Sequence, residues 1–125
     1  MPSIYARLGG YDPVKLAIDG LFIRVVRDAE LAASLAGRAI DSHAGHVRPF
    51  IAAALGGPEL YRGPDIAALL AGLGVTDDHV DRTLGHLAAV VAALGADEVL
   101  IGDVRATLEP LRALVVQRRA LPAAA

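Results

Sequence analysis

The four histidines are the residues of this chain best suited to ligate a metal or to move a proton near neutral pH. His43 and His46 lie three residues apart, so a helix would present both imidazoles on one face. A neutral imidazole at either position could ligate iron. The alternative is that both are partly exposed side chains that cap or pack locally at the start of a helix. For His79 we expect a surface or capping contact, and for His86 a hydrogen bond within the core.

Other kinds of catalytic chemistry find little support. Ser42 and His43 are neighbours in the chain, which is a poor geometry for a nucleophile and its base. Gly56-Gly57 is not followed by the Lys-Ser/Thr pair of a phosphate-binding loop. The acids between residues 77 and 81 suit a helix N-terminus better than paired acid–base catalysis. We therefore expect a binding protein and not an enzyme.

The composition predicts a folded single-domain protein and argues against several kinds of partner and metal site. The chain has 125 residues, of which 54% are hydrophobic and 21% charged, so we expect one folded domain. A net charge of −2 argues against a nucleic-acid partner. The absence of cysteine excludes disulfides and thiolate metal sites. There is no run of 18 apolar residues and no apolar signal segment, which predicts a cytoplasmic protein with no membrane partner.

Apolar residues recur at spacings of three and four along the chain, which predicts an all-α fold. The expected elements are helices at 11–26, 65–73 and 76–94, a short turn at 28–35, a helix from Asp41 or Ser42 to about Leu55, and a last helix at 97–116 that Pro110 interrupts. We expect a single domain at residues 1–117 and a frayed tail at residues 118–125.

Pro49 falls inside the helix that is expected to end near Leu55. Proline removes one backbone hydrogen bond and clashes with the preceding turn, at a cost of about 3 kcal/mol. It also pushes Arg48 away from helical angles. The sequence thus predicts that this helix either kinks at Pro49 or begins near Arg48.

Four stretches of the sequence resemble one protein family. They are Leu55–Gly63, Ile4–Gly10, Arg24–Leu31 and Gly72–His79. In these stretches the chain resembles the group I truncated haemoglobins, which are short globins, and the resemblance runs from about residue 3 to about residue 115. It implies a truncated-globin fold in which two crossed helix pairs surround an apolar pocket, with haem b as the cofactor.

The correspondence of positions between this chain and the family implies that the family's functional side chains have been replaced. The histidine that ligates haem iron corresponds to Leu70, at a fixed distance after the Tyr-x-Gly turn at 61–63. The tyrosine and glutamine that donate hydrogen bonds to bound oxygen correspond to Phe22 and Val47. A leucine has no lone pair for a metal, and neither Phe22 nor Val47 can polarise oxygen. The resemblance therefore implies a pocket without its axial ligand.

The implied pocket keeps some features of a haem site. Phe50 is aromatic, as the family usually is, whereas Leu35 and Val80 stand where the family has aromatic rings. His46 occupies the position of the second axial ligand in six-coordinate members, and His43 the place nearest the bound gas. The resemblance implies a pocket with His46 or His43 as iron ligand and a lining of Phe22, Leu35, Val47, Phe50, Ile66, Leu69, Leu70, Leu73, Val80 and Leu84.

Two functions are consistent with these residues. The first is a haem-binding globin with iron held from the distal side by His46 or His43, which binds or senses a diatomic gas and stabilises oxygen weakly. The second is a haem-free globin-fold module that binds another apolar small molecule or a protein partner. The replacements at Leu70, Phe22, Val47 and Leu35 favour the second function. The difficulty of filling a haem-sized space with small aliphatic residues favours the first.

Overall fold

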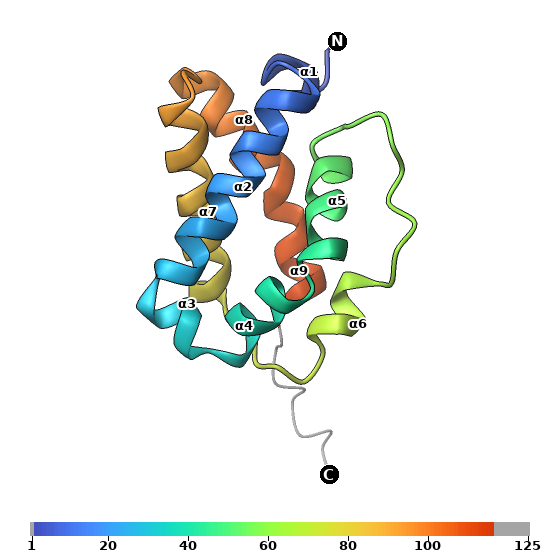
Figure 1. The fold of residues 1–125 in the computed structure, drawn as a ribbon, viewed down its shortest axis with the longest axis vertical. Coiled ribbons are helices and arrows are strands. Elements are labelled where there is room, and N and C mark those ends of the chain that lie inside the picture. The colour runs from blue at the N-terminus through green and yellow to red at the C-terminus, as the bar shows by residue number, and fades with distance from the viewer. Residues whose placement is uncertain (1, 117–125) are drawn as a thin grey trace.

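The computed structural model describes residues 2–116 (Figure 1). It consists of helices joined by turns and by a longer non-helical segment at residues 55–65. No strand occurs in that range, so the all-α prediction is confirmed. The longer helices are α2 (Tyr11–Arg27), α5 (Ala44–Ala54), α7 (Asp77–Ala93) and α8 (Glu98–Leu108). The shorter elements are α1 (Ile4–Arg7), α3 (Ala29–Ala33), α4 (Leu35–Ser42), α6 (Ile66–Leu70), the 3-10 turn η1 (Glu109–Leu111) and α9 (Arg112–Val115).

Polar caps begin most of these helices where the sequence predicts them. The side chains of Asp28, Asp65, Thr76 and Asp97 accept backbone N–H groups at the starts of α3, α6, α7 and α8. Helix α8 ends just before Pro110, and the chain continues through η1 into α9, so the predicted interruption is confirmed. The predicted tail at residues 118–125 lies outside the described residues.

The region between α3 and α5 differs from the prediction. Neither Asp41 nor Ser42 starts a helix, because both belong to the end of a separate helix, α4. That helix begins at its cap Ser34, whose hydroxyl accepts the Gly37 N–H at 2.9 Å. Residue 37 must be glycine here, since a Cβ would lie 1.9 Å from the Leu31 carbonyl oxygen. The sequence pattern did not predict this tight turn.

Pro49 lies inside a continuous helix. Helix α5 begins at Ala44, with His43 at its N-cap position, so the expectation of a start near Arg48 is wrong. The carbonyl that proline leaves without a helical donor belongs to Gly45, four residues earlier, and both residues are exposed. Water can therefore satisfy that carbonyl, which explains how the helix tolerates a proline at this position.

One apolar cluster forms the core of the described residues. Helix α7 packs along α2 on one side and against α8 on the other, while α4, α5, α6 and α9 surround the remaining space (Figure 1). The most deeply buried side chains come from α2, α3, α7, α8 and the end of α5: Val14, Val25, Leu31, Leu55, Val91 and Val104. No helix in residues 2–116 is both long and apolar enough to cross a membrane.

Candidate functional site

Between the helices lies a partly open apolar cavity of about 130 Å³, which we call the inner cavity. Its walls come from α2, α4, α5, α6, α7 and the C-terminal elements. Six of the ten side chains expected in the pocket line it: Val47, Phe50, Ile66, Leu70, Val80 and Leu84. Residues far apart in the sequence thus come together at the pocket that the resemblance to the truncated haemoglobins implies.

Leu70 lies in the wall of the inner cavity. It is the last residue of α6, a helix held in place at its start by Asp65, whose carboxylate accepts the Ala67 N–H at 3.0 Å. The Leu70 side chain is 4% exposed. Where the resemblance places an iron-ligating imidazole, the cavity therefore has an aliphatic side chain that cannot donate an electron pair.

Helix α5 directs Val47 and Phe50 into the cavity. Val47 is buried, and the Phe50 ring meets the Tyr61 ring edge-on with centroids 5.4 Å apart. The Tyr61 hydroxyl in turn donates to the Pro64 carbonyl. This contact fixes the chain segment between α5 and α6 against the outside of the cavity wall.

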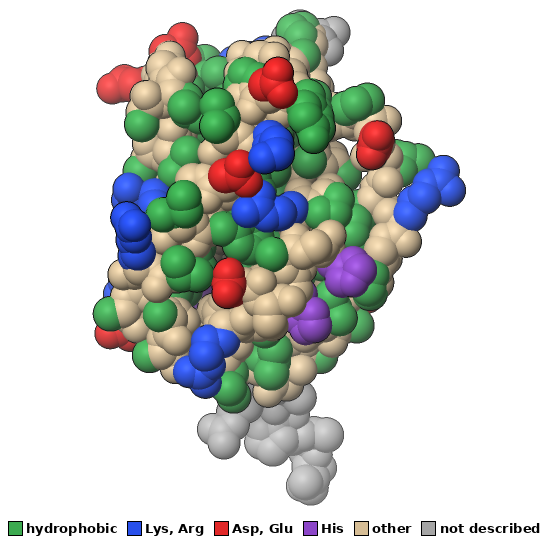
Figure 2. All heavy atoms as spheres, in the orientation of Figure 1, with side chains coloured by type: hydrophobic (Ala, Val, Ile, Leu, Met, Phe, Trp, Pro, Cys, Tyr) green, Lys and Arg blue, Asp and Glu red, His purple; other side chains and the backbone are tan. Residues whose placement is uncertain are grey.

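Neither of the two expected iron ligands lines the inner cavity. Backbone hydrogen bonds from the His46 and Val47 N–H groups to the His43 carbonyl, at 2.9 and 3.0 Å, set the phase of the first turn of α5. With Val47 turned inward, His46 is exposed and His43 is half-buried at the N-cap position. Figure 2 shows histidine side chains at the surface of this face.

Four other expected pocket residues lie outside the lining of the cavity. Phe22 is buried, with the Arg48 guanidinium 4.7 Å from its ring centroid. Leu35 is 58% exposed at the start of α4. The other two, Leu69 and Leu73, are half-buried against the core. The cavity is therefore smaller than the pocket that the resemblance implies.

His79 is a cavity residue that the sequence analysis did not place there. Its Nδ1 accepts the Thr76 N–H at 3.1 Å, and the Thr76 hydroxyl accepts the His79 N–H at the same distance. This is a capping box with histidine in the place of glutamate. The Thr-x-x-His spacing was the available signal for it. The capping bond occupies the nitrogen that would otherwise be free to bind a metal.

His86 belongs to a separate polar network at the start of α3. Its Nε2 lies 2.7 Å from an Asp28 carboxylate oxygen, and its Nδ1 accepts from Arg24 Nε at 3.1 Å. Arg82 approaches the same carboxylate at 3.4 Å. The hydrogen bond from His86 is the main cause that lowers the pKa of Asp28 to about 2, and the backbone N–H groups at the cap act in the same direction. This network joins α2, α3 and α7 beside the inner cavity.

Haem does not fit the inner cavity as the structure shows it. A volume of about 130 Å³ falls below the roughly 300–1,000 Å³ of typical ligand pockets. The one imidazole in the lining, His79, has its Nδ1 in the capping box. The geometry suits a small apolar molecule and offers iron no ligand.

Comparisons with known proteins identify the relatives of this chain. The profile of the bacterial-like globins matches residues 3–117. The group 1 truncated haemoglobin GlbN of Mycolicibacterium paratuberculosis is 31% identical over 109 residues, which cover 87% of this chain and 80% of that protein. The corresponding protein of Synechocystis is 29% identical, over 85% of this chain and 89% of its own length.

Solved structures give the same result for the fold. A truncated haemoglobin variant from Tetrahymena pyriformis in the Fe(III) form superposes with a TM-score of 0.82 and 25% identity, over 94% of this chain and all of that one. A Synechococcus 2/2 haemoglobin with covalently attached haem superposes with a TM-score of 0.74 and 25% identity, over the same shares of the two chains. The truncated-globin architecture expected from the sequence is thus confirmed.

Proposed function

Because this chain belongs to the bacterial-like globin family, we propose that it uses the globin cavity for a small apolar molecule, without a bond between iron and histidine. The observation that carries this proposal is the inner cavity itself, at about 130 Å³ with the buried Leu70 in its wall. An apolar cavity of about 150 Å³ in another protein stays dry and takes up benzene or xenon. The present cavity has room for molecules between a diatomic gas and a single ring.

The polar groups around the cavity support an apolar occupant. The Thr83 hydroxyl donates to the His79 carbonyl at 2.8 Å, and His79 Nδ1 is held by the Thr76 N–H. The guanidinium of Arg112, which also borders the cavity, donates to the carboxylates of Asp77, Asp81 and Glu109. Each of these groups has a protein partner already. A polar ligand would lose its hydrogen bonds to water and regain few from these groups, so it would bind poorly.

Haem binding is the second candidate function, and membership of the family supports it. The group 1 truncated haemoglobins and the haem-containing Synechococcus structure have the fold of this chain. On this proposal α4, α5 and α6 would move apart to admit haem b, and His46 or His43 would turn inward to ligate the iron. Phe22 and Val47 would give bound oxygen no hydrogen bond, so such a protein would hold or sense a diatomic gas without strong oxygen affinity.

A thermal-shift titration with benzene tests the first proposal. Benzene should raise the Tm of the protein in a saturable way, because a ligand that binds only the folded state stabilises it in proportion to RT ln(1 + [L]/Kd). Val80→Phe fills part of the inner cavity and should abolish the rise. The matched control Val99→Phe, at a side chain 69% exposed on α8, should retain it. No rise in the parent protein, or an equal rise in Val80→Phe, would contradict the proposal.

A further inference from the structure

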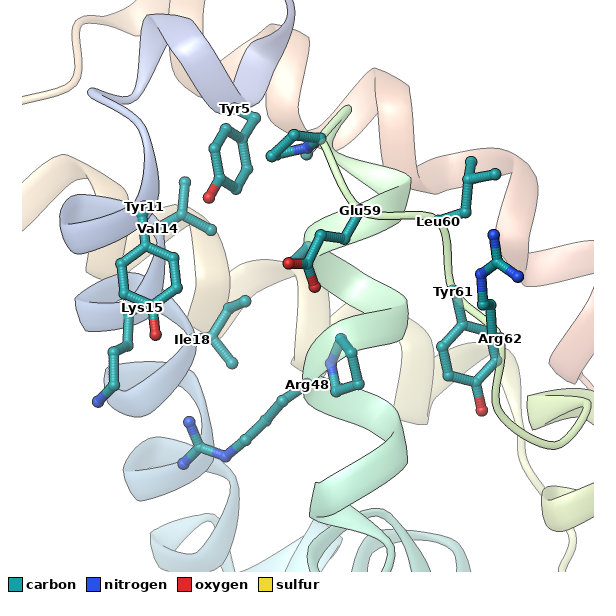
Figure 3. Close-up of a pocket in the computed structure, with 14 residues that line it drawn as sticks. Tyr5, Tyr11, Val14, Lys15, Ile18, Arg48, Glu59, Leu60, Tyr61 and Arg62 are labelled. Atoms are coloured by element: carbon teal, nitrogen blue, oxygen red, sulfur yellow. The ribbon is translucent and has the colours of Figure 1, made fainter.

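We propose that a second cavity, on the other side of α5, binds a small zwitterion with an apolar body, of the kind represented by a free aromatic amino acid. This outer cavity has a volume of about 370 Å³ and lies between α1, α2, α5 and the segment that follows α5 (Figure 3). Its lining shares no residue with that of the inner cavity. Its volume falls within the roughly 300–1,000 Å³ that small-molecule sites occupy.

The segment from Leu55 to Tyr61 forms one wall of the outer cavity and is anchored at both ends. The Tyr5 N–H donates to the Leu55 carbonyl at 2.8 Å. Gly57 lies so close to Tyr5 that a Cβ would be 3.1 Å from its ring and 2.9 Å from the Ala52 carbonyl oxygen. At the far end, Tyr61 packs edge-on against Phe50. The wall is therefore in place before any ligand binds, which lowers the entropy cost of binding.

Aromatic and aliphatic side chains form the body of the outer cavity. Tyr5 and Tyr11 line it from α1 and α2 (Figure 3). Val14 and Ile18 lie behind them on α2. A flat or aliphatic ligand body can pack on these surfaces, and tyrosine rings suit such contacts because they combine a large apolar face with a polar tip.

The charges are divided between two facing walls. On the α2 and α5 side, Asp19 pairs with both Lys15, at 3.1 Å, and Arg48, so this group of three carries one net positive charge. The hydrogen bond from Arg48 is the main cause that lowers the pKa of Asp19, which keeps the carboxylate ionised. Lys15 is 57% exposed and has three N–H donors, so donors remain for a ligand. Figure 3 shows its ammonium turned away from Glu59, so the flexible Lys15 side chain must rotate toward the cavity to meet a ligand carboxylate.

The opposite wall carries the negative charge. Glu59 extends its carboxylate from the segment after α5 into the cavity, toward the tyrosines (Figure 3). Among residues 2–116, no ion pair within 4.0 Å involves Glu59. Arg62 also borders the cavity, but it lies beside Leu60 and Tyr61, away from Tyr5 and Tyr11. A ligand with an ammonium group near Glu59 and a carboxylate near Lys15 would complement both walls.

Three probes of similar shape test this inference: phenylalanine as the zwitterion, phenethylammonium as the cation and 3-phenylpropionate as the anion. An NMR titration that follows the ring signals of Tyr5 and Tyr11 should show saturable shifts with phenylalanine. Each probe with only one charged group should bind about tenfold more weakly, because it leaves one charged contact unmade. Equal binding of all three probes, or no saturable shift with phenylalanine, would overturn the proposal.

Two substitutions test which residue of the outer cavity contacts each charged group of the ligand. Glu59→Gln should weaken phenylalanine binding about tenfold and leave 3-phenylpropionate unaffected, and Lys15→Gln should weaken phenylalanine binding and leave phenethylammonium unaffected. All these side chains are exposed, so the variants should fold, which circular dichroism verifies. The matched control Arg105→Gln, at an exposed side chain of α8 that lines neither cavity, should bind phenylalanine like the parent protein. Loss of binding in Arg105→Gln, with Glu59→Gln unchanged, would place the site elsewhere.

Discussion

The inner and outer cavities lie on opposite sides of the same helix and have opposite chemistry. Helix α5 turns Val47, Phe50 and Ile51 to the inner cavity, whereas Arg48, Pro49 and Ala52 line the outer one. The inner cavity is small, apolar and bordered by polar groups that already have partners. The outer cavity is larger and has charges on facing walls. Because an α-helix has 3.6 residues per turn, the six residues 47–52 point side chains to both sides of α5 and so contribute to both cavities.

The comparison indicates where polar recognition is retained in this globin. The polar residues that the resemblance expects in the pocket are replaced by Leu70, Phe22 and Val47, so the inner cavity depends on shape and burial alone. Figure 2 shows acidic and basic side chains gathered over α2 and α5, on the face of the outer cavity. We infer that the inner cavity selects ligands by shape and the outer cavity by charge. The following substitutions compare how packing and charge around each cavity stabilise the protein.

The largest effect should come from Leu70→Ala. This substitution removes buried methyl groups from the inner wall and enlarges the cavity, so it should lower the free energy of unfolding by about 2–5 kcal/mol. Urea unfolding followed by circular dichroism measures the change. Leu60→Ala is the matched control at the outer cavity, where the leucine is 78% exposed, and it should change stability by less than about 0.5 kcal/mol. Similar costs at the two positions would show that the inner wall is not packed as the structure shows.

Asp28→Asn should have the next largest effect, because it alters the network that joins α2, α3 and α7 beside the inner cavity. Asparagine can still cap α3, but it cannot pair with Arg82 or accept the proton of His86 as a charged group. The loss should be about 1–3 kcal/mol at pH 7. The matched control Asp97→Asn, at the exposed cap of α8, should cost far less. Equal losses would mean that the network contributes nothing beyond the cap.

The same variant has a defined pH dependence. The pKa of Asp28 is about 2 in the folded protein and 3.8 as the ordinary value, so the ionised carboxylate favours the folded state. This contribution is complete above about pH 5 and is lost as the pH falls from about 4 through 2. The stability difference between the parent protein and Asp28→Asn should therefore shrink over that interval. A difference that grows on acidification would contradict the assignment.

The smallest effect should come from Asp19→Asn, next to the outer cavity. The Asp19 side chain is 32% exposed, and ion pairs of this kind contribute about 0.2–1 kcal/mol. The loss should diminish further in high salt, because solvent ions screen exposed charges. Unfolding in low and high salt measures both quantities. If Asp19→Asn lowered the free energy of unfolding as much as Asp28→Asn, the predicted contrast between the buried Asp28 network and the more exposed Asp19 ion pairs would be wrong.

Local signals in the sequence predicted the helices that carry the sites. Asp28, Asp65, Thr76 and Asp97 each precede an apolar pattern with helical spacing, and each caps a helix in the structure. The fixed distance from the Tyr-x-Gly turn placed Leu70 at the pocket, and Leu70 lies in the wall of the inner cavity. These features depend on residues close together in the chain, which is why sequence reasoning reached them.

The features that sequence reasoning missed depend on contacts between distant segments. The direction of His46 follows from the phase of α5, which its start at Ala44 and the inward packing of Val47 set together. The break before α5 depends on the close approach of Gly37 to the Leu31 carbonyl. The outer cavity combines α1 and α2 with α5 and the segment that follows α5, and no local pattern predicts that these parts meet.

Haemin titration is the measurement that tests the central claim most directly. The protein should be titrated in parallel with His46→Ala and His43→Ala, while the Soret absorbance is recorded. The account in which the inner cavity takes only a small apolar molecule predicts the spectrum of free or loosely adsorbed haemin, identical for all three proteins. A stoichiometric complex with a histidine-ligated Soret band, lost in His46→Ala or His43→Ala, would contradict it and establish the haem-binding alternative.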